Sequence, residues 1–107
     1  MPLFGPPDVR KLKPKDIKKL EAKRDVGTLV EALADSPDAV VRMEAACALA
    51  EVGDESALPA LRRAARHPDN QEPYLFVPGA PKNQARWGVA QESRNAMKEI
   101  RTRTRSR

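Results

Sequence analysis

Apolar residues recur at helical spacing between positions 26 and 33. They stand at i, i+3, i+4 and i+7 and so form one stripe along a helix: Val26, Leu29, Val30 and Leu33. Asp25 is a good N-cap, because its carboxylate can accept hydrogen bonds from the first free N–H groups of a helix. Pro37 forces Ser36 out of helical geometry and ends the segment. The pattern predicts a helix over residues 26–35.

A second and a third stripe follow, with only a short link between them. The stripe of residues 39–52 stands at i, i+4, i+7, i+8 and i+11 and consists of Val41, Ala45, Ala48, Leu49 and Val52. Gly53 suits a left-handed C-terminal cap, and Asp54 can cap the next helix. That helix is expected over 55–66, with one face formed by Leu58, Leu61 and Ala65. The short link predicts a helical hairpin of two nearly antiparallel helices.

The chain contains an internal repeat. The tripeptide Ser-Pro-Asp at 36–38 recurs 31 residues later as His-Pro-Asp at 67–69. A shift of 48 residues aligns the stripe of 39–52 with a similar one at Val89, Ser93, Ala96, Met97 and Ile100. Because the second shift is longer than the first, an insertion must interrupt the repeat. We expect an irregular insertion at 70–84 and a helix over 85–100.

The pattern is weaker at the two ends of the chain. Residues 1–13 are expected to be extended or to form one helical turn, and Pro14 can occupy the first turn of a short helix. The 107 residues suit one all-α domain of about five helices over 1–100, and they exclude a second full domain. Residues 101–107 contain no apolar side chain and are expected to form a basic, disordered tail.

Alanine takes the place of many large apolar side chains. The chain has 16 alanines beside 21 residues of leucine, isoleucine, valine and phenylalanine. So few large apolar residues are close to the composition of disordered chains. The alanines fall on the helical stripes, however, and we interpret them as faces that let helices approach closely.

The net charge of +5 is unevenly distributed. Residues 1–24 hold 8 basic and 3 acidic side chains, and residues 70–107 hold the same numbers. Residues 25–69 reverse the balance with 9 acidic side chains and 4 arginines. Because 4 arginines lie in the last seven residues, the net positive charge belongs mainly to the C-terminus. Any phosphate contact is therefore expected at the ends of the chain, and the folded body is better suited to protein contacts.

Residue content excludes several classes of protein. No segment approaches the roughly 20 consecutive apolar residues that cross a bilayer, and no signal-sequence pattern is present, so we expect a cytoplasmic protein without membrane contact. The single cysteine, Cys47, cannot form an internal disulfide and is expected to be a small buried residue. The single histidine, His67, leaves no histidine pair for a metal and is expected to cap a helix end. We predict no catalytic residue, no metal and no cofactor.

Residues 36–69 resemble a HEAT repeat of the short kind found in phycobilisome-lyase-like proteins. The resemblance rests on the alanine-rich helix and on Pro37, Asp38, Val41, Arg42, the Gly53-Asp54 turn and the segment Ala57-Leu58-Pro59-Ala60-Leu61. The family implies a right-handed superhelix of stacked helix pairs, a short α-solenoid of the armadillo type, commonly used to bind other macromolecules. It also implies that the second helix of each pair lines a concave side, where an acidic partner would meet Arg62, Arg63 and Arg66.

The insertion and its flank carry three of the four aromatic residues, Tyr74, Phe76 and Trp87. Long loops in compact domains are often functional, and exposed aromatic side chains can anchor a protein partner. Alternatively, Leu75, Phe76 and Val77 fold back to cover an apolar groove at the C-terminal end of the stack. The sequence leaves both interpretations open.

The main hypothesis is a non-catalytic HEAT-like scaffold or adaptor that binds a protein partner. The alternative is an accessory protein whose basic termini bind nucleic acid weakly and without sequence specificity, through Arg101, Arg103, Arg105 and Arg107. Self-association between the basic termini of one molecule and the acidic centre of another is a further option. An enzyme on this scaffold would need a pocket of converging polar groups.

Overall fold

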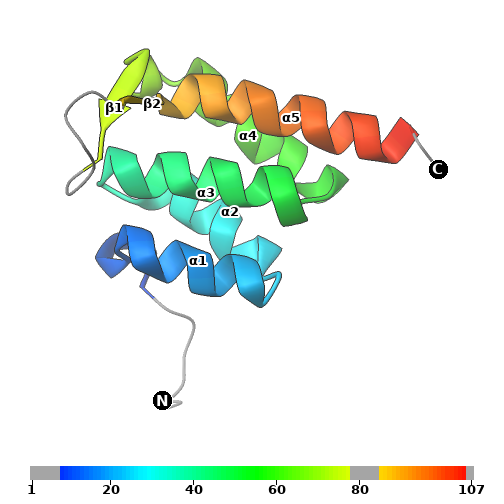
Figure 1. Cartoon of the computed structure of the whole chain (residues 1–107), viewed down its shortest axis with the longest axis horizontal. Helices are drawn as coiled ribbons and strands as arrows, with labels where there is room; N and C mark the ends of the chain where they lie inside the picture. The colour runs from blue at the N-terminus through cyan, green and yellow to red at the C-terminus, as the bar shows by residue number, and fades with distance from the viewer. Residues whose placement is uncertain (1–7, 78–84, 106–107) are drawn as a thin grey trace.

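The computed structural model describes residues 8–77 and 85–105 and is predominantly helical (Figure 1). Its five α-helices are α1 (Pro14–Ala22), α2 (Val26–Asp35), α3 (Ala39–Val52), α4 (Leu58–Arg66) and α5 (Val89–Arg105). Three single 3-10 turns accompany them, η1 (Val9–Lys11), η2 (Glu55–Ala57) and η3 (Pro68–Asn70), together with the short strands β1 (Tyr74–Phe76) and β2 (Ala85–Trp87). The predicted all-α fold is confirmed.

The helices form two layers, as in an α-solenoid. In Figure 1, α1, α3 and α5 lie side by side and run in the same direction, while α2 and α4 lie behind them. α2 packs on both α1 and α3 and so covers the seam between them. α4 packs mainly on α5 and α2. Each helix of the rear layer therefore holds neighbouring units together.

The starts of α2 and α3 follow from their N-caps, as predicted. The Asp25 carboxylate accepts a hydrogen bond from the Thr28 backbone N–H at 3.2 Å, at the start of α2. The Asp38 carboxylate accepts one from the Val40 backbone N–H at 2.9 Å, at the start of α3. These contacts satisfy N–H groups that have no partner inside the helix, which is why each helix begins where it does.

α3 is the central helix, and it is buried on all sides rather than along the single predicted stripe. It contacts α1, α2 and α5. Met43 and Ala46, which lie outside the predicted stripe, are fully buried. Glu51 is the one residue of α3 that is classed as exposed. A helix enclosed from three directions needs apolar residues all round, and small ones where neighbours come close.

The link from α3 to α4 differs from the prediction in two ways. Gly53 is extended (φ −72°, ψ 161°) and not left-handed; glycine is required because a Cβ would collide with the Leu49 carbonyl oxygen. α4 begins only at Leu58, after the η2 turn, instead of at residue 55. The two helices therefore do not form a directly packed hairpin, because α4 makes its main contacts with α5 and α2.

Part of the insertion is regular, contrary to the expectation for 70–84, and α5 does not begin at residue 85. β1 and β2 pair antiparallel, with Tyr74 opposite Trp87. The Gly88 N–H donates to the Pro73 carbonyl oxygen at 2.8 Å, and a Cβ at Gly88 would collide with the carbonyl of Glu72. This close approach ends the strand pair and delays the start of α5 to Val89.

α5 continues to Arg105, where the sequence predicted a disordered tail from residue 101. The Arg103 guanidinium donates to the carbonyl oxygens of Gly53, at 2.7 Å, and of Ala50. It thereby caps the C-terminus of α3, and this contact anchors a segment that has no apolar side chain. Residues 106–107 of the expected tail lie outside the described residues.

The crowding around α3 predicts that enlarging Ala46 destabilises the protein. Ala46→Leu should lower the free energy of unfolding by about 1–3 kcal/mol, because the added carbons have no space between the packed helices. Ala22→Leu, at an exposed position of α1, is the matched control and should change it by less than about 0.5 kcal/mol. Urea denaturation followed by circular dichroism measures both. Equal losses in the two variants would contradict the close packing of α3.

Candidate functional site

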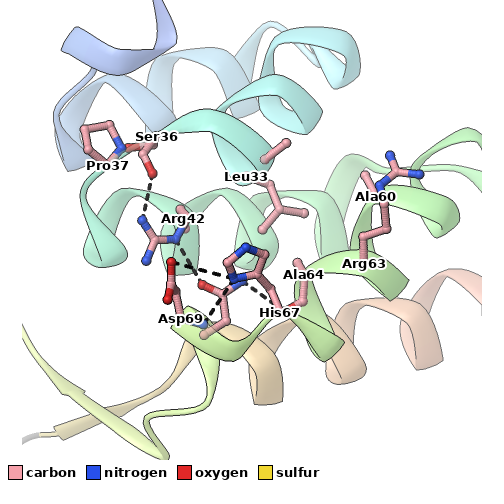
Figure 2. A pocket seen from close by; sticks show the side chains of 11 residues that line it. Leu33, Ser36, Pro37, Arg42, Ala60, Arg63, Ala64, His67 and Asp69 are labelled. Atoms are coloured by element: carbon pink, nitrogen blue, oxygen red, sulfur yellow. Dashed lines mark hydrogen bonds and ion pairs between the residues drawn. The ribbon is translucent and has the colours of Figure 1, made fainter.

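A groove opens between the C-terminal halves of α2 and α4 (Figure 2). It has a volume of about 570 Å³ and an apolar floor formed by Leu33, Ala34, Pro37, Ala60 and Ala64. Polar side chains surround the floor: Ser36, Arg42, Arg63, His67, Asp69 and Asn70. We call this the α2–α4 groove. It has the composition of a binding site, with apolar area for affinity and a few polar groups for orientation.

Arg42, in the first turns of α3, fixes one side of the groove. Its Nη1 donates to the Ser36 carbonyl oxygen at 2.7 Å, and its Nε donates to Asn70 Oδ1 at 3.1 Å. Asn70 in turn donates its Nδ2 hydrogen to the Ala64 carbonyl oxygen at 3.0 Å. Carbonyl groups at helix ends lack partners within the helix. The Arg42–Asn70 pair supplies these partners at the ends of both α2 and α4 and ties the two ends together.

His67 and Arg63, at the C-terminal end and in the middle of α4, also line the groove. His67 Nδ1 accepts the Asp69 backbone N–H at 3.1 Å, so the histidine caps η3 as predicted. Arg63 extends from α4 at the other end of the groove (Figure 2). With Arg42 and Arg63 against Asp69 alone, the formal charge of the rim is positive. Such a rim suits acidic side chains that reach over an apolar floor.

The strand pair presents a second surface, which we call the aromatic face. Tyr74, Phe76 and Trp87 point to one side of it and are 52%, 70% and 48% exposed. The Tyr74 and Trp87 rings stack, with centroids 5.1 Å apart and planes inclined by 24°. Leu75 points to the other side and, like Val77, packs on the core. Leu75 and Val77 thus cover the core, as one interpretation of the insertion expected, whereas Phe76 does not. Partner binding by the exposed aromatic side chains stays a prediction.

Cys47 is half-buried in a polar cluster, whereas the sequence predicted a small buried apolar residue. Its thiol donates to Glu92 Oε2 at 2.9 Å, and Arg86 Nη2 lies 3.4 Å from Sγ. Arg86 also pairs with Glu44 at 3.1 Å, on the side of the strand pair opposite the aromatic face. Burial and the hydrogen bond to Glu92 raise the pKa of the Cys47 thiol from 9.0 to about 12. The cluster attaches the strand pair to α3 and α5.

The arginines singled out from the sequence do not share one place. Among those of α4, Arg63 lines the groove, whereas Arg62 and Arg66 are exposed outside it. Arg101 and Arg105 are exposed on α5, Arg103 is committed to capping α3, and Arg107 lies outside the described residues. Sequence reasoning missed Asn70 as a partner of Arg42, because a side-chain contact between residues 28 positions apart has no periodic signal.

Within residues 8–77 and 85–105, no group of three or more histidine, cysteine, aspartate or glutamate side chains is arranged to hold a metal ion. Over the same residues, no helix is long and apolar enough to cross a membrane.

A family profile described as HEAT repeats matches residues 6–73, which is 68 of the 107 residues. The matched region contains α1 to α4 and the whole α2–α4 groove, and it ends just before β1. No curated protein and no solved structure matches the chain.

The contacts of Arg42 predict that it stabilises the fold. Arg42→Met should lower the free energy of unfolding by about 1–3 kcal/mol, because it leaves the Ser36 carbonyl and the Asn70 amide without a partner. Arg63→Met removes the same charge from the same groove at an exposed position and should cost less than about 0.5 kcal/mol. Urea unfolding midpoints compare the two variants. Equal midpoints would show that the Arg42 bridge contributes nothing.

The raised pKa of Cys47 predicts slow reaction of its thiol. Since the folded pKa of about 12 lies above the ordinary value of 9.0, protonation of the thiol stabilises the fold below pH 9, and this stabilisation is lost as the pH rises toward 12. At pH 9 iodoacetamide should therefore alkylate the folded protein at least about tenfold more slowly than the urea-unfolded chain. Equal rates, measured by mass spectrometry, would contradict the raised pKa.

Proposed function

The chain belongs to the HEAT-repeat family, and from this we propose that it is a scaffold or adaptor that binds a protein partner without catalysing a reaction. HEAT repeats commonly serve as protein-interaction scaffolds. The observation that carries the proposal is the aromatic face: three large aromatic side chains are about half exposed or more on one side of a strand pair. Exposed aromatic groups of this kind are typical of interaction sites.

The geometry of the aromatic face supports its use as an anchor. The stacked rings of Tyr74 and Trp87 restrict each other, so they lose little conformational freedom when a partner covers them. Phe76, at 70% exposure, offers most of its ring surface to a partner. The backbone beneath is held by the strand pairing and by the contact between Arg86 and Glu44. A partner would thus bind a surface that is already formed.

The α2–α4 groove supports the same proposal with a different chemistry. Arg63 stands at its rim, where it could pair with a carboxylate of the partner. The apolar floor could receive a small apolar side chain of the same segment. Arg42 is already engaged with the protein and would add positive charge without moving. We therefore assign Arg63, and not Arg62 or Arg66, to the acidic partner that the family resemblance implied.

The state of the nucleophilic and basic groups supports a non-catalytic role. Cys47 is held as a neutral thiol by its high pKa, and the thiolate is the reactive form. His67 Nδ1 is occupied by the Asp69 N–H, and its ring stands at the rim of an open groove. The hydrogen bond from the Cys47 thiol to the Glu92 carboxylate favours the neutral form of that thiol.

The proposal predicts that removing aromatic rings abolishes partner binding. The double variant Tyr74→Ala, Phe76→Ala should capture the partner at a level at least about tenfold lower than the wild-type chain does, because two anchors are lost. Its helical circular dichroism should stay unchanged, since both side chains are exposed. Affinity capture from extract of the source cells, quantified by mass spectrometry, measures retention.

Two further variants sharpen the test. Arg63→Glu reverses a charge in the groove, whereas Lys18→Glu reverses one on the exposed face of α1, away from both surfaces. We expect Arg63→Glu to weaken retention and Lys18→Glu to leave it unchanged. Identical sets of captured proteins for the wild type and for the aromatic double variant would overturn the proposal.

A further inference from the structure

The last helix carries a continuous line of positive charge. Its residues stand at i, i+4, i+7 and i+11 and therefore fall on one side of α5: Arg94, Lys98, Arg101 and Arg105. All four are exposed. Within the described part of the chain, none of their side chains forms an ion pair or a hydrogen bond with another residue. We call this line of side chains the α5 stripe.

The α5 stripe lies on the side of the helix that is turned away from α3. Glu92 and Arg103 mark the side facing α3, because they contact Cys47 and Gly53. The stripe residues are rotated by roughly 120–180° from both of these positions, at 100° per residue. Because its residues are exposed, the stripe also lies outside the contact between α5 and α4.

Two arginines of α4 extend the same surface. On α4, Arg63 lies on the flank toward α2, because it lines the groove with α2 residues. Arg62 lies about 100° from Arg63 round the helix and outside the groove. Arg66 follows Arg62 by one turn, and both are exposed. The helices α4 and α5, which pack on each other, thus together present six exposed cations.

We infer that this surface binds the phosphate backbone of duplex nucleic acid without reading its sequence. The α5 stripe is about 16 Å long at a rise of 1.5 Å per residue, and a duplex carries one negative charge per roughly 1.7 Å of its axis. Several phosphates can therefore face the stripe at once. The contact is a charge match along a line, which is how proteins bind nucleic acid non-specifically.

The composition of α5 favours polyphosphate over an acidic protein. All apolar residues of the helix are buried, namely Val89, Ala90, Ala96, Met97 and Ile100. Protein interfaces need an apolar or aromatic anchor at their centre, and the α5 stripe has none. The side chains beside it, Gln91, Asn95 and Thr102, are polar and uncharged. The surface offers hydrogen-bond donors and positive charge, which is what phosphate contacts require.

Charge repulsion within the α5 stripe also favours a polyanionic ligand. Arg94 and Lys98, and likewise Arg101 and Arg105, are like charges four residues apart on one helix face, which destabilises a helix. No acidic side chain pairs with any of them in the described residues. A bound polyanion would neutralise this repulsion. The inference is independent of the proposed protein partner, because neither the aromatic face nor the α2–α4 groove contains a stripe residue.

A salt-dependent binding measurement tests the inference. The full chain is titrated into a fluorescein-labelled 20-base-pair DNA duplex of mixed sequence, and fluorescence anisotropy is recorded at several salt concentrations between 50 and 200 mM. We expect a dissociation constant of about 10 μM or tighter at 50 mM salt, and similar values for a second duplex of unrelated sequence. Absence of binding at 50 mM salt would overturn the inference.

The triple variant Arg94→Gln, Lys98→Gln, Arg101→Gln isolates the surface. The slope of log affinity against log salt should become shallower by about 0.9 for each lost phosphate contact, so by about 2.7 in all. The variant should unfold at the same temperature as the wild type or higher, because like-charge repulsion is removed. Lys15→Gln, Lys18→Gln, Lys19→Gln removes equal charge from exposed positions of α1 and should keep the wild-type slope. Equal slope changes in the two variants would show that only net charge matters and would overturn the inference.

A competition experiment separates nucleic acid from an acidic protein. Poly-L-glutamate is added to the complex at the same concentration of negative charge as unlabelled duplex. We expect the duplex to displace the label at least about tenfold more effectively, because its phosphates are held in a regular line along a stiff backbone, whereas the carboxylates of flexible poly-L-glutamate must first be ordered. Equal displacement by poly-L-glutamate would overturn the assignment to nucleic acid and indicate a general acidic partner.

Discussion

The fold depends on how closely the neighbours of α3 can approach it. α3 is enclosed by α1, α2 and α5, and alanines supply much of its contact surface. Small side chains bring helix backbones close together, so that a chain with few large apolar residues can still bury a continuous core. The arrangement of α1, α2 and α5 follows from this packing, whereas α4 is positioned by its contacts with α5 and α2. The same enclosure explains why α3 lacks the polar face that isolated surface helices have.

Two arginines satisfy carbonyl groups at helix ends, which apolar packing leaves without a partner. Arg42 reaches the carbonyl that ends α2 and, through Asn70, the end of α4, while Arg103 reaches the carbonyls that end α3. In both cases one cation joins elements that are distant in sequence. Helix C-termini carry partial negative charge as well as free carbonyl groups, so arginine satisfies both at once. Arg42, at the rim of the groove, and Arg103, near the end of α5, thus both have a structural role.

Local signals predicted the parts of the structure that depend on local interactions. The caps Asp25 and Asp38 and the stripes that follow them gave α2 and α3 to the residue. The β1–β2 pairing was missed because the two strands are separated along the chain and no local pattern links them. The helical structure of α5 beyond Ile100 was missed because it depends on the contact of Arg103 with Gly53, 50 positions away. The aromatic residues were recognised as candidates from composition alone, but their exposure follows from the alternation along β1, which no helical period shows.

The strand pair also has a mechanical consequence for the chain around it. Because β1 and β2 are held to each other and to α3, the place where α5 starts is set by the pairing and not by the length of chain between the strands. That connecting segment can therefore lengthen or shorten without changing the register of the helical stack. The strand pair thus separates the helical stack from changes in the connecting segment. A tag or a foreign peptide could therefore be introduced between β1 and β2 with little effect on the fold.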